Sequence, residues 1–60
     1  MLTIWLANGN IEEFYVDSKM TINNDTKLLL FQTIDRTVVF NLGKVSGWAI
    51  SNDVETEILE

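Results

Sequence analysis

The carboxylates are the side chains most able to do chemistry in this sequence, because it contains neither histidine nor cysteine. Glu12 and Glu13 stand next to each other in a segment that predicts a strand, and adjacent strand residues point to opposite faces. They therefore cannot converge on a substrate as general acid and general base. The spacing of Glu55, Glu57 and Glu60 matches no calcium loop. We expect both groups to be solvated, and we predict no metal site.

The hydroxyl and amino groups are no better placed for covalent chemistry. A serine nucleophile needs a neighbouring base to take its proton, and the sequence has no histidine for this role. Lys19, Lys27 and Lys44 all fall at expected turns or strand ends, and no glycine-rich loop is present that could cradle a phosphate. The sequence therefore predicts no enzyme, no catalytic residue and no cofactor.

Tryptophan is the residue type through which the chain could bind a partner. Trp5 and Trp48 fall on strand faces that are not clearly core, and tryptophan is enriched at the energetic centres of interfaces. The alternative is that both complete the core of a small barrel. Stacking on nucleic-acid bases is disfavoured, because nine acidic and four basic residues give a net charge of −5 and few phosphate contacts. Core and interface both stay open for the two indoles.

Three consecutive strands between Lys27 and Ser51 organise the rest of the chain: KLLLFQTI, TVVFNL and VSGWAIS. The separators, Asp35-Arg36 and Gly43-Lys44, have the two-residue length of tight hairpins, and Gly43 suits a type II′ turn. One face of this antiparallel sheet is then almost wholly apolar and forms the expected core. The implied pairs are Phe31 with Phe40, Leu29 with Leu42, Phe40 with Gly47 and Val38 with Ala49.

An N-terminal hairpin precedes these strands. The turn Asn8-Gly9-Asn10 separates LTIWLA from IEEFYV, and Asn-Gly is a strong hairpin signal. A three-residue loop would set Ile4 opposite Phe14, whereas a two- or four-residue loop would set Ile4 opposite Glu13. We favour the first register, because it keeps the carboxylates at the periphery of the core.

The second strand is predicted to be long and bent. Asp17-Ser18-Lys19 interrupts its alternation as a bulge or bend, after which KMTIN resumes. A turn centred on Asn24-Asp25 then sets Met20 opposite Leu29. The tail SNDVETEILE fits a short helix or a strand. Residues 1–60 thus predict a single all-β domain: a five-stranded antiparallel meander that curls into a small, partly open barrel with a short C-terminal tail helix or strand.

The outer face of this sheet is the most informative feature of the sequence, because it is apolar where water should favour polar residues. Cover must come from the tail, from a curled sheet or from another chain. Two aromatics of the N-terminal hairpin join this surplus. The expected interaction surface consists of Trp48, Val39, Ile50, Leu30, Leu28, Ile34, Trp5 and Tyr15.

Length and composition favour a small protein that associates with others. A chain of 60 residues without cysteine buries barely enough apolar surface to fold alone, and oligomerisation is a natural remedy. No apolar run approaches the 18 residues of a membrane span, and the N-terminus lacks the basic region of a signal peptide. We expect a cytoplasmic protein that forms a homodimer and contacts neither membrane nor nucleic acid directly.

The segment KLLLFQTIDRTVVFNLGKVSGWAI, a strand, a short turn and a VVFNL-type strand that leads to a further strand, covers about half of the chain. It resembles the short, acidic, uncharacterised proteins encoded in phages and prophages of Gram-positive bacteria. Such proteins are small, β-rich and often oligomeric, and some inhibit host defence systems by binding a host protein. The resemblance implies action in the host cytoplasm, but no residue here matches a motif that would name a target.

These observations together predict a small protein-interaction module that acts by occupying a surface. Self-association is expected through Trp48, Val39, Ile50 and their neighbours on the outer face. The concrete version is a phage-encoded inhibitor of a host defence protein. The alternative is a structural or assembly accessory protein without catalytic activity.

Overall fold

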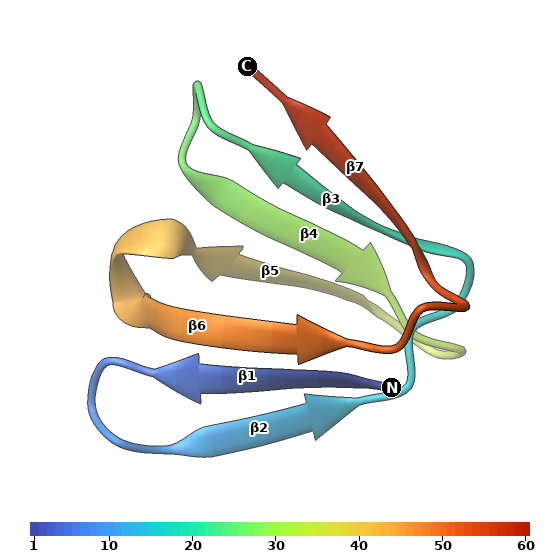
Figure 1. Cartoon of the computed structure of the whole chain (residues 1–60), viewed down its shortest axis with the longest axis horizontal. Coiled ribbons are helices and arrows are strands. Elements are labelled where there is room, and N and C mark those ends of the chain that lie inside the picture. The colour runs from blue at the N-terminus through green and yellow to red at the C-terminus, as the bar shows by residue number, and fades with distance from the viewer.

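The computed structural model describes residues 1–60 and consists of seven strands in two sheets (Figure 1). A three-stranded sheet has the order β2-β1-β6, and a four-stranded sheet has the order β5-β4-β3-β7. One short 3-10 turn, η1, joins β5 to β6. The elements are β1 (Leu2–Leu6), β2 (Ile11–Phe14), β3 (Lys19–Asn23), β4 (Leu28–Gln32), β5 (Thr37–Asn41), η1 (Leu42–Lys44), β6 (Val45–Ile50) and β7 (Glu55–Leu59).

The core lies between the two sheets and is small. Its six buried residues come in alternating pairs from the inner strands β1, β3 and β4, as period-two patterning requires. Phe14 of β2 bridges the sheets, with its ring centroid 5.0 Å from that of Phe31 and 5.9 Å from that of Phe40. Such tilted pairs contribute about 1 kcal/mol each beyond the area they bury. The buried residues are Leu2, Ile4, Met20, Ile22, Leu29 and Phe31.

The hairpin between β4 and β5 keeps the predicted faces but not the predicted register. Phe31 lies opposite Val38, not opposite Phe40. The Thr33 N–H donates to the Arg36 carbonyl at 2.8 Å, so the turn is centred on Ile34-Asp35, one position before the predicted Asp35-Arg36. A shift of two residues in the pairing leaves every side chain on its original face, and the alternation alone cannot detect it.

The N-terminal hairpin shows the same displacement. Its loop has the predicted three residues, but they are residues 7–9, and Ile4 lies opposite Glu12 where Phe14 was expected. Gly9 takes the last loop position with a φ of 93°. Positive φ is easily reached by glycine alone, and this requirement fixes which residue closes the loop.

The predicted five-stranded meander is wrong, because its long second strand is two strands in different sheets. The chain leaves β2, passes through Ser18 with a φ of 81°, and enters β3 in the four-stranded sheet. The Asp17 N–H donates to the Gln32 carbonyl at 2.7 Å, which ties this corner to the end of β4. Met20 then faces Phe31, two residues from the predicted partner.

The predicted hairpin at Gly43-Lys44 is also wrong. The Asn41 side chain accepts a hydrogen bond from the Gly43 N–H at 2.9 Å and begins η1, and positive φ among the glycines is confined to Gly9. The chain then crosses to the other sheet, where β6 pairs with β1 and not with β5. This crossing gives the buried strand β1 a neighbour on each side. No ladder joins β6 to β5 or β2 to β7, so the sheets stay separate and do not close into a barrel.

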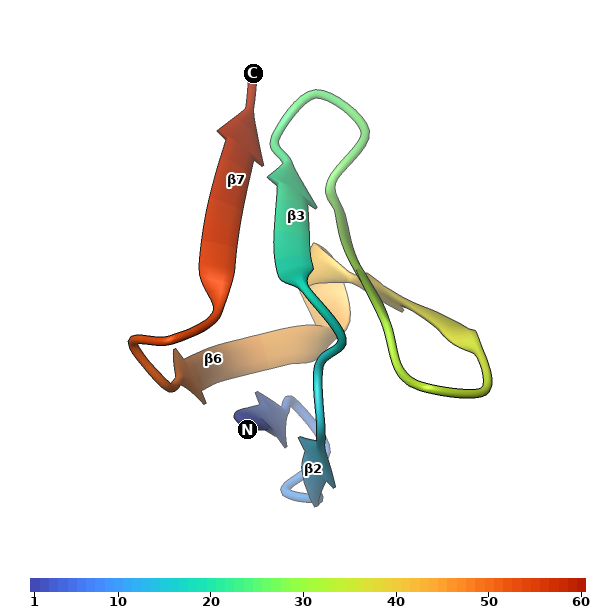
Figure 2. The same ribbon diagram turned by 90° about the vertical axis from the view of Figure 1, so that its right-hand side faces the viewer.

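The C-terminal tail is a strand, so the helical alternative is wrong. β7 runs parallel to β3 and extends the four-stranded sheet, and the Asn24 N–H donates to the Leu59 carbonyl at 2.8 Å. The turn before it lies beside the N-terminus, since the Ser51 N–H donates to the Met1 carbonyl at 3.1 Å. Figure 2 shows β7 and the β4–β5 loop on opposite sides of β3.

Candidate interaction surfaces

The side of the four-stranded sheet that faces away from the core has an apolar centre. We call it the outer face. Cross-strand register places Leu30 beside Val39 and Leu28 in the next row, with Leu59 of β7 in that same row. Val39 is 51% exposed and Leu59 42% exposed, while Leu28 and Leu30 are half-buried by their neighbours. No second layer of the chain covers these side chains.

The outer face carries no carboxylate on three of its four strands, β3, β4 and β5. Across β3, β4 and β5 its one charged residue is Lys19, although the chain has nine acidic residues. The acids of this face stand on β7, where Glu57 lies 3.3 Å from the Lys19 ammonium group. Both partners are about half exposed, so this ion pair contributes at most about 1 kcal/mol.

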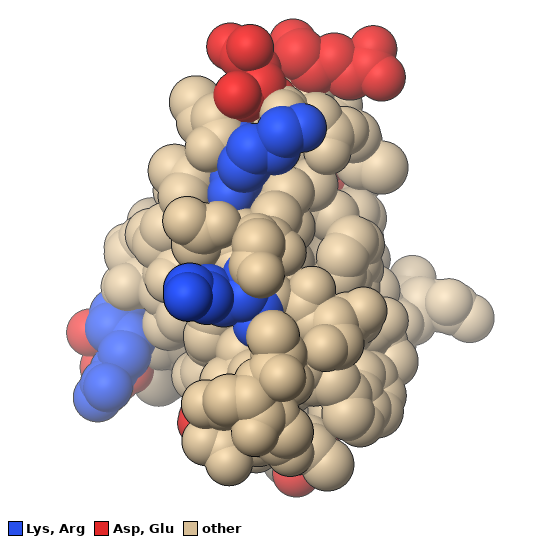
Figure 3. Space-filling view, turned by 90° about the vertical axis from the view of Figure 1, so that its left-hand side faces the viewer, with Lys and Arg blue, Asp and Glu red and all other residues tan.

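The distribution of charge over the whole surface is uneven. Figure 3 shows acidic side chains gathered at the end of the molecule that carries the C-terminus in Figure 1. Basic side chains lie below them in this view, and the opposite end is largely uncharged. A partner that approaches this end of the molecule would therefore meet acidic side chains.

A second surface feature is a cleft at the corner between the two sheets. We call it the corner cleft. It has a volume of about 450 Å³ and is lined by residues 14–17 and 33–36. Tyr15 is 77% exposed and Ile34 is 97% exposed. Each of the two segments that line the cleft therefore carries one large side chain that is open to solvent.

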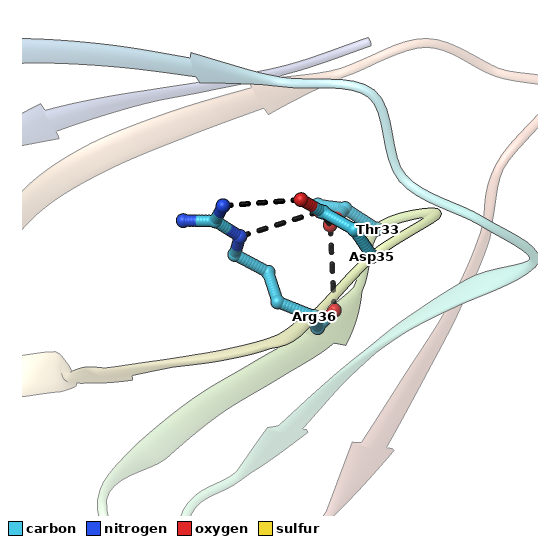
Figure 4. A network of polar contacts seen from close by, with 3 residues as sticks. All are labelled: Thr33, Asp35 and Arg36. Carbon is cyan, nitrogen blue, oxygen red and sulfur yellow. Dashed lines mark hydrogen bonds and ion pairs between the residues drawn. The ribbon is translucent and has the colours of Figure 1, made fainter.

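The polar groups of the corner cleft satisfy one another. The Arg36 guanidinium donates to both carboxylate oxygens of Asp35, from Nε at 3.3 Å and from Nη2 at 3.0 Å (Figure 4). The Thr33 hydroxyl lies 2.9 Å from Oδ1 of the same carboxylate. The hydrogen bond from Arg36 and then that from Thr33 lower the pKa of Asp35, and the same carboxylate raises the pKa of Arg36. A carboxylate held ionised in this way is a poor proton acceptor.

The expected interaction surface is not one surface in the structure. Leu28, Leu30 and Val39 lie together on the outer face, as predicted. Tyr15 and Ile34 line the corner cleft. Trp5 is 41% exposed on the outward side of the three-stranded sheet, where it pairs with Gly47 and Ile11.

The placement of Trp48 and Ile50 beside Val39 is wrong, because β6 belongs to the other sheet. Ile50 lies opposite Leu2 and packs against the core. Trp48 lies opposite Ile4, so it shares the inward face, yet it is 41% exposed. The indole is thus on the core side of its sheet but is only partly covered.

Three further exposed apolar residues lie outside the expected interaction surface. Leu59 joins the outer face only because β7 pairs in parallel with β3, a pairing that no turn signal announces. Ile58, 61% exposed, and Ile11, 59% exposed, stand on the edge strands β7 and β2.

The chain shows no similarity that would supply a function from elsewhere. No family model matches it, and no curated protein or solved structure matches it. The structure holds no helix with the length and apolar character that crossing a membrane requires.

Proposed function

We propose that this chain is a small protein-binding module that acts by occupying a surface of its partner, with the outer face as the contact. The supporting observation is the uncovered apolar centre formed by Leu28, Leu30 and Val39, with Leu59 on the far side of Asn23 in the row of Leu28. An exposed apolar patch with polar borders is typical of a protein-interaction site. The polar neighbours, such as Thr21 and Asn41, would form the rim.

Charge indicates the kind of partner. Glu55 and Glu57 border the outer face on β7, and the chain as a whole carries a net charge of −5. A complementary protein would place apolar side chains on the centre and basic side chains against this border. A host defence protein bound by a phage-encoded inhibitor is the concrete version of this proposal, and it rests on the resemblance described above.

The size of the outer face limits the affinity. Four strands of five residues cover about 300 Å² in projection, given the strand spacing and the rise per residue. Standard stable interfaces bury about 800 Å² on each partner. Binding through the outer face alone would therefore be transient, unless the contact continues over the acidic border at β7.

Capture from a bacterial lysate with matched variants tests the proposal. The wild-type chain, Val39→Glu and Ile11→Glu would be immobilised, and the recovered proteins quantified by mass spectrometry. Val39 and Ile11 are similarly exposed, at 51% and 59%, but lie on different sheets. We expect one stoichiometric host protein to be recovered by wild type and by Ile11→Glu and to be lost with Val39→Glu.

Two results would contradict this proposal. Recovery of no stoichiometric protein, or equal loss with both variants, would remove the outer face as the contact. Recovery of virion components would favour the alternative of a structural or assembly accessory protein. Circular dichroism of each variant checks that the strand content is unchanged.

A further inference from the structure

The two sheets have four free edges, and these differ in charge. The edge strand β2 carries Glu12 and Glu13, and the edge strand β7 carries Glu55 and Glu57. Charges of this kind are a common protection against edge-to-edge pairing. The edge strand β6 has the sequence VSGWAI and no charge at all, and β5 is likewise uncharged. Two edges are therefore protected by carboxylates and two are not.

The backbone groups of β6 that face its free edge can be identified from the ladder. The Ser51 N–H donates to the Met1 carbonyl, so this pair is hydrogen-bonded. Hydrogen-bonded and non-hydrogen-bonded pairs alternate along antiparallel strands, so Ala49 bonds to β1 and its neighbours do not. The N–H and C=O groups of Trp48 and Ile50 thus point away from β1, toward the free edge.

The side chains beside this edge lack cover. Trp48 shares the inward face with Ile4, but it is 41% exposed where Ile4 is fully buried. On the other sheet, Ile58 aligns with the buried Ile22 and is 61% exposed. A three-stranded sheet thus stands against a four-stranded one, and inward side chains on the edge strands β6 and β7 remain open to solvent. One more strand next to β6 would extend the smaller sheet.

We propose that β6 pairs antiparallel with β6 of a second copy of this chain, which joins the two three-stranded sheets into one sheet of six strands. A second copy can supply this strand, and charge restricts which of its edges can pair. A copy that carries a net charge of −5 can approach without opposing carboxylates only along β5 or β6. The inward residues of β5, Val38 and Phe40, are half-buried against the core, whereas Trp48 of β6 is 41% exposed.

This pairing goes beyond the proposed function, because it concerns self-association through a different sheet. It leaves the outer face of each copy free, so the dimer would present two such faces to partners. Two paired strands of six residues form an interface at the low end of known sizes, below about 1,200 Å² in total. We therefore expect a dissociation constant in the micromolar range, which sets the concentrations that a test must reach.

Sedimentation velocity of chemically synthesised chains tests the pairing, since 60 residues are accessible to synthesis. Methylation of the Trp48 amide nitrogen removes a donor at the free edge and keeps the indole. Amide methylation at Ile58 and at Val39 provides matched controls for the edges of β7 and β5. These two N–H groups also face free edges, because their neighbours Leu59 and Val38 bond to β3 and β4.

We expect the wild-type chain to change from monomer to dimer as its concentration is raised toward about 1 mM, and methylation at Trp48 to weaken this dimer about tenfold or more. The two control methylations should leave the dimer almost unchanged. A chain that stays monomeric throughout would overturn the proposal. A dimer lost on methylation at Val39 or Ile58, and retained on methylation at Trp48, would overturn the choice of β6.

Fluorescence gives an independent readout at the same edge. In Trp5→Phe the indole of Trp48 is the single tryptophan, and its emission should shift to shorter wavelength with the same concentration midpoint as sedimentation. Dimer formation without this shift would contradict pairing at β6. Trp5→Phe and methylation at Trp48 leave the outer face unchanged. Capture of a partner through the outer face, tested with Val39→Glu, can therefore succeed or fail independently of the dimer.

Discussion

At the scale of single residues, the charges of this protein are arranged to satisfy themselves without chemistry. Asp35 accepts two hydrogen bonds from Arg36 and one from the Thr33 hydroxyl, so both of its carboxylate oxygens are paired within one turn. Half of the eight remaining acidic side chains stand on the edge strands β2 and β7. Charge in this molecule therefore decides which surfaces can approach another protein, and apolar side chains supply the contact.

The turn Thr33–Arg36 makes a specific prediction about titration. The pKa of Asp35 is lowered in the folded state, chiefly by the hydrogen bond from Arg36. Its ionised form thus stabilises the fold above the pKa that Asp35 has in the unfolded chain, and this contribution is lost as the pH falls through the folded pKa. We expect Arg36→Gln to raise the titration midpoint of the Asp35 carboxyl carbon, measured by NMR. An unchanged midpoint would show that the guanidinium pair is not formed in solution.

Burial makes a second prediction at this scale, using two adjacent leucines. Leu29 is fully buried and Leu30 is half-buried on the opposite face of β4. Removing a buried leucine side chain costs about 2–5 kcal/mol. The free energy of unfolding of a 60-residue domain is about 3–9 kcal/mol. We expect Leu29→Ala to be largely unfolded, as measured by urea denaturation.

Leu30→Ala serves as the control for that experiment. Its truncation should cost less than half as much, because part of the side chain already lies in solvent. Equal destabilisation by both substitutions would mean that the outer face is covered in solution. Dimer formation or another partner would then have to be measured before the comparison is interpreted.

At the scale of elements, the sequence predicts the faces of β1, β3, β4 and β5 well, but it inverts the two faces of β6 and predicts neighbours poorly. All six buried residues lie on faces that alternation assigns to the core, because a period of two is set by the backbone itself. The pairing of β6 with β1 could not be predicted from turn signals. Asn41 and Gly43 resemble the end of a hairpin in sequence, and it is the Asn41 side chain that starts η1 instead. The outer face was predicted in its centre but not at Leu59, which depends on a parallel pairing between distant segments.

The role of Asn41 as the start of η1 can be tested directly. Asn41→Ala removes the acceptor for the Gly43 N–H, and loss of a comparable cap in helices costs about 1 kcal/mol. We expect lower stability and faster amide hydrogen exchange at Gly43. Asn52→Ala is the control, since Asn52 lies in an exposed turn. Equal exchange at Gly43 in both variants would mean that η1 does not depend on this side chain.

At the scale of the whole molecule, two proposed contacts differ in their electrostatics. The β6 edge would bring together two copies that each carry a net charge of −5, and long-range repulsion opposes this association. The outer face, bordered by Glu55 and Glu57, would meet a basic partner, and long-range attraction assists that association. Both contacts use uncharged apolar side chains, so charge modulates them in opposite directions.

Salt should therefore separate the two contacts. Raising the ionic strength from 0.01 M to 0.5 M shortens the screening length from about 30 Å to under about 8 Å. We expect the dimer to become tighter in sedimentation experiments, because repulsion between the copies is screened. Retention of a partner captured through the outer face should fall over the same range. If salt weakens the dimer, self-association rests on ion pairs, and an edge without charges cannot be its site.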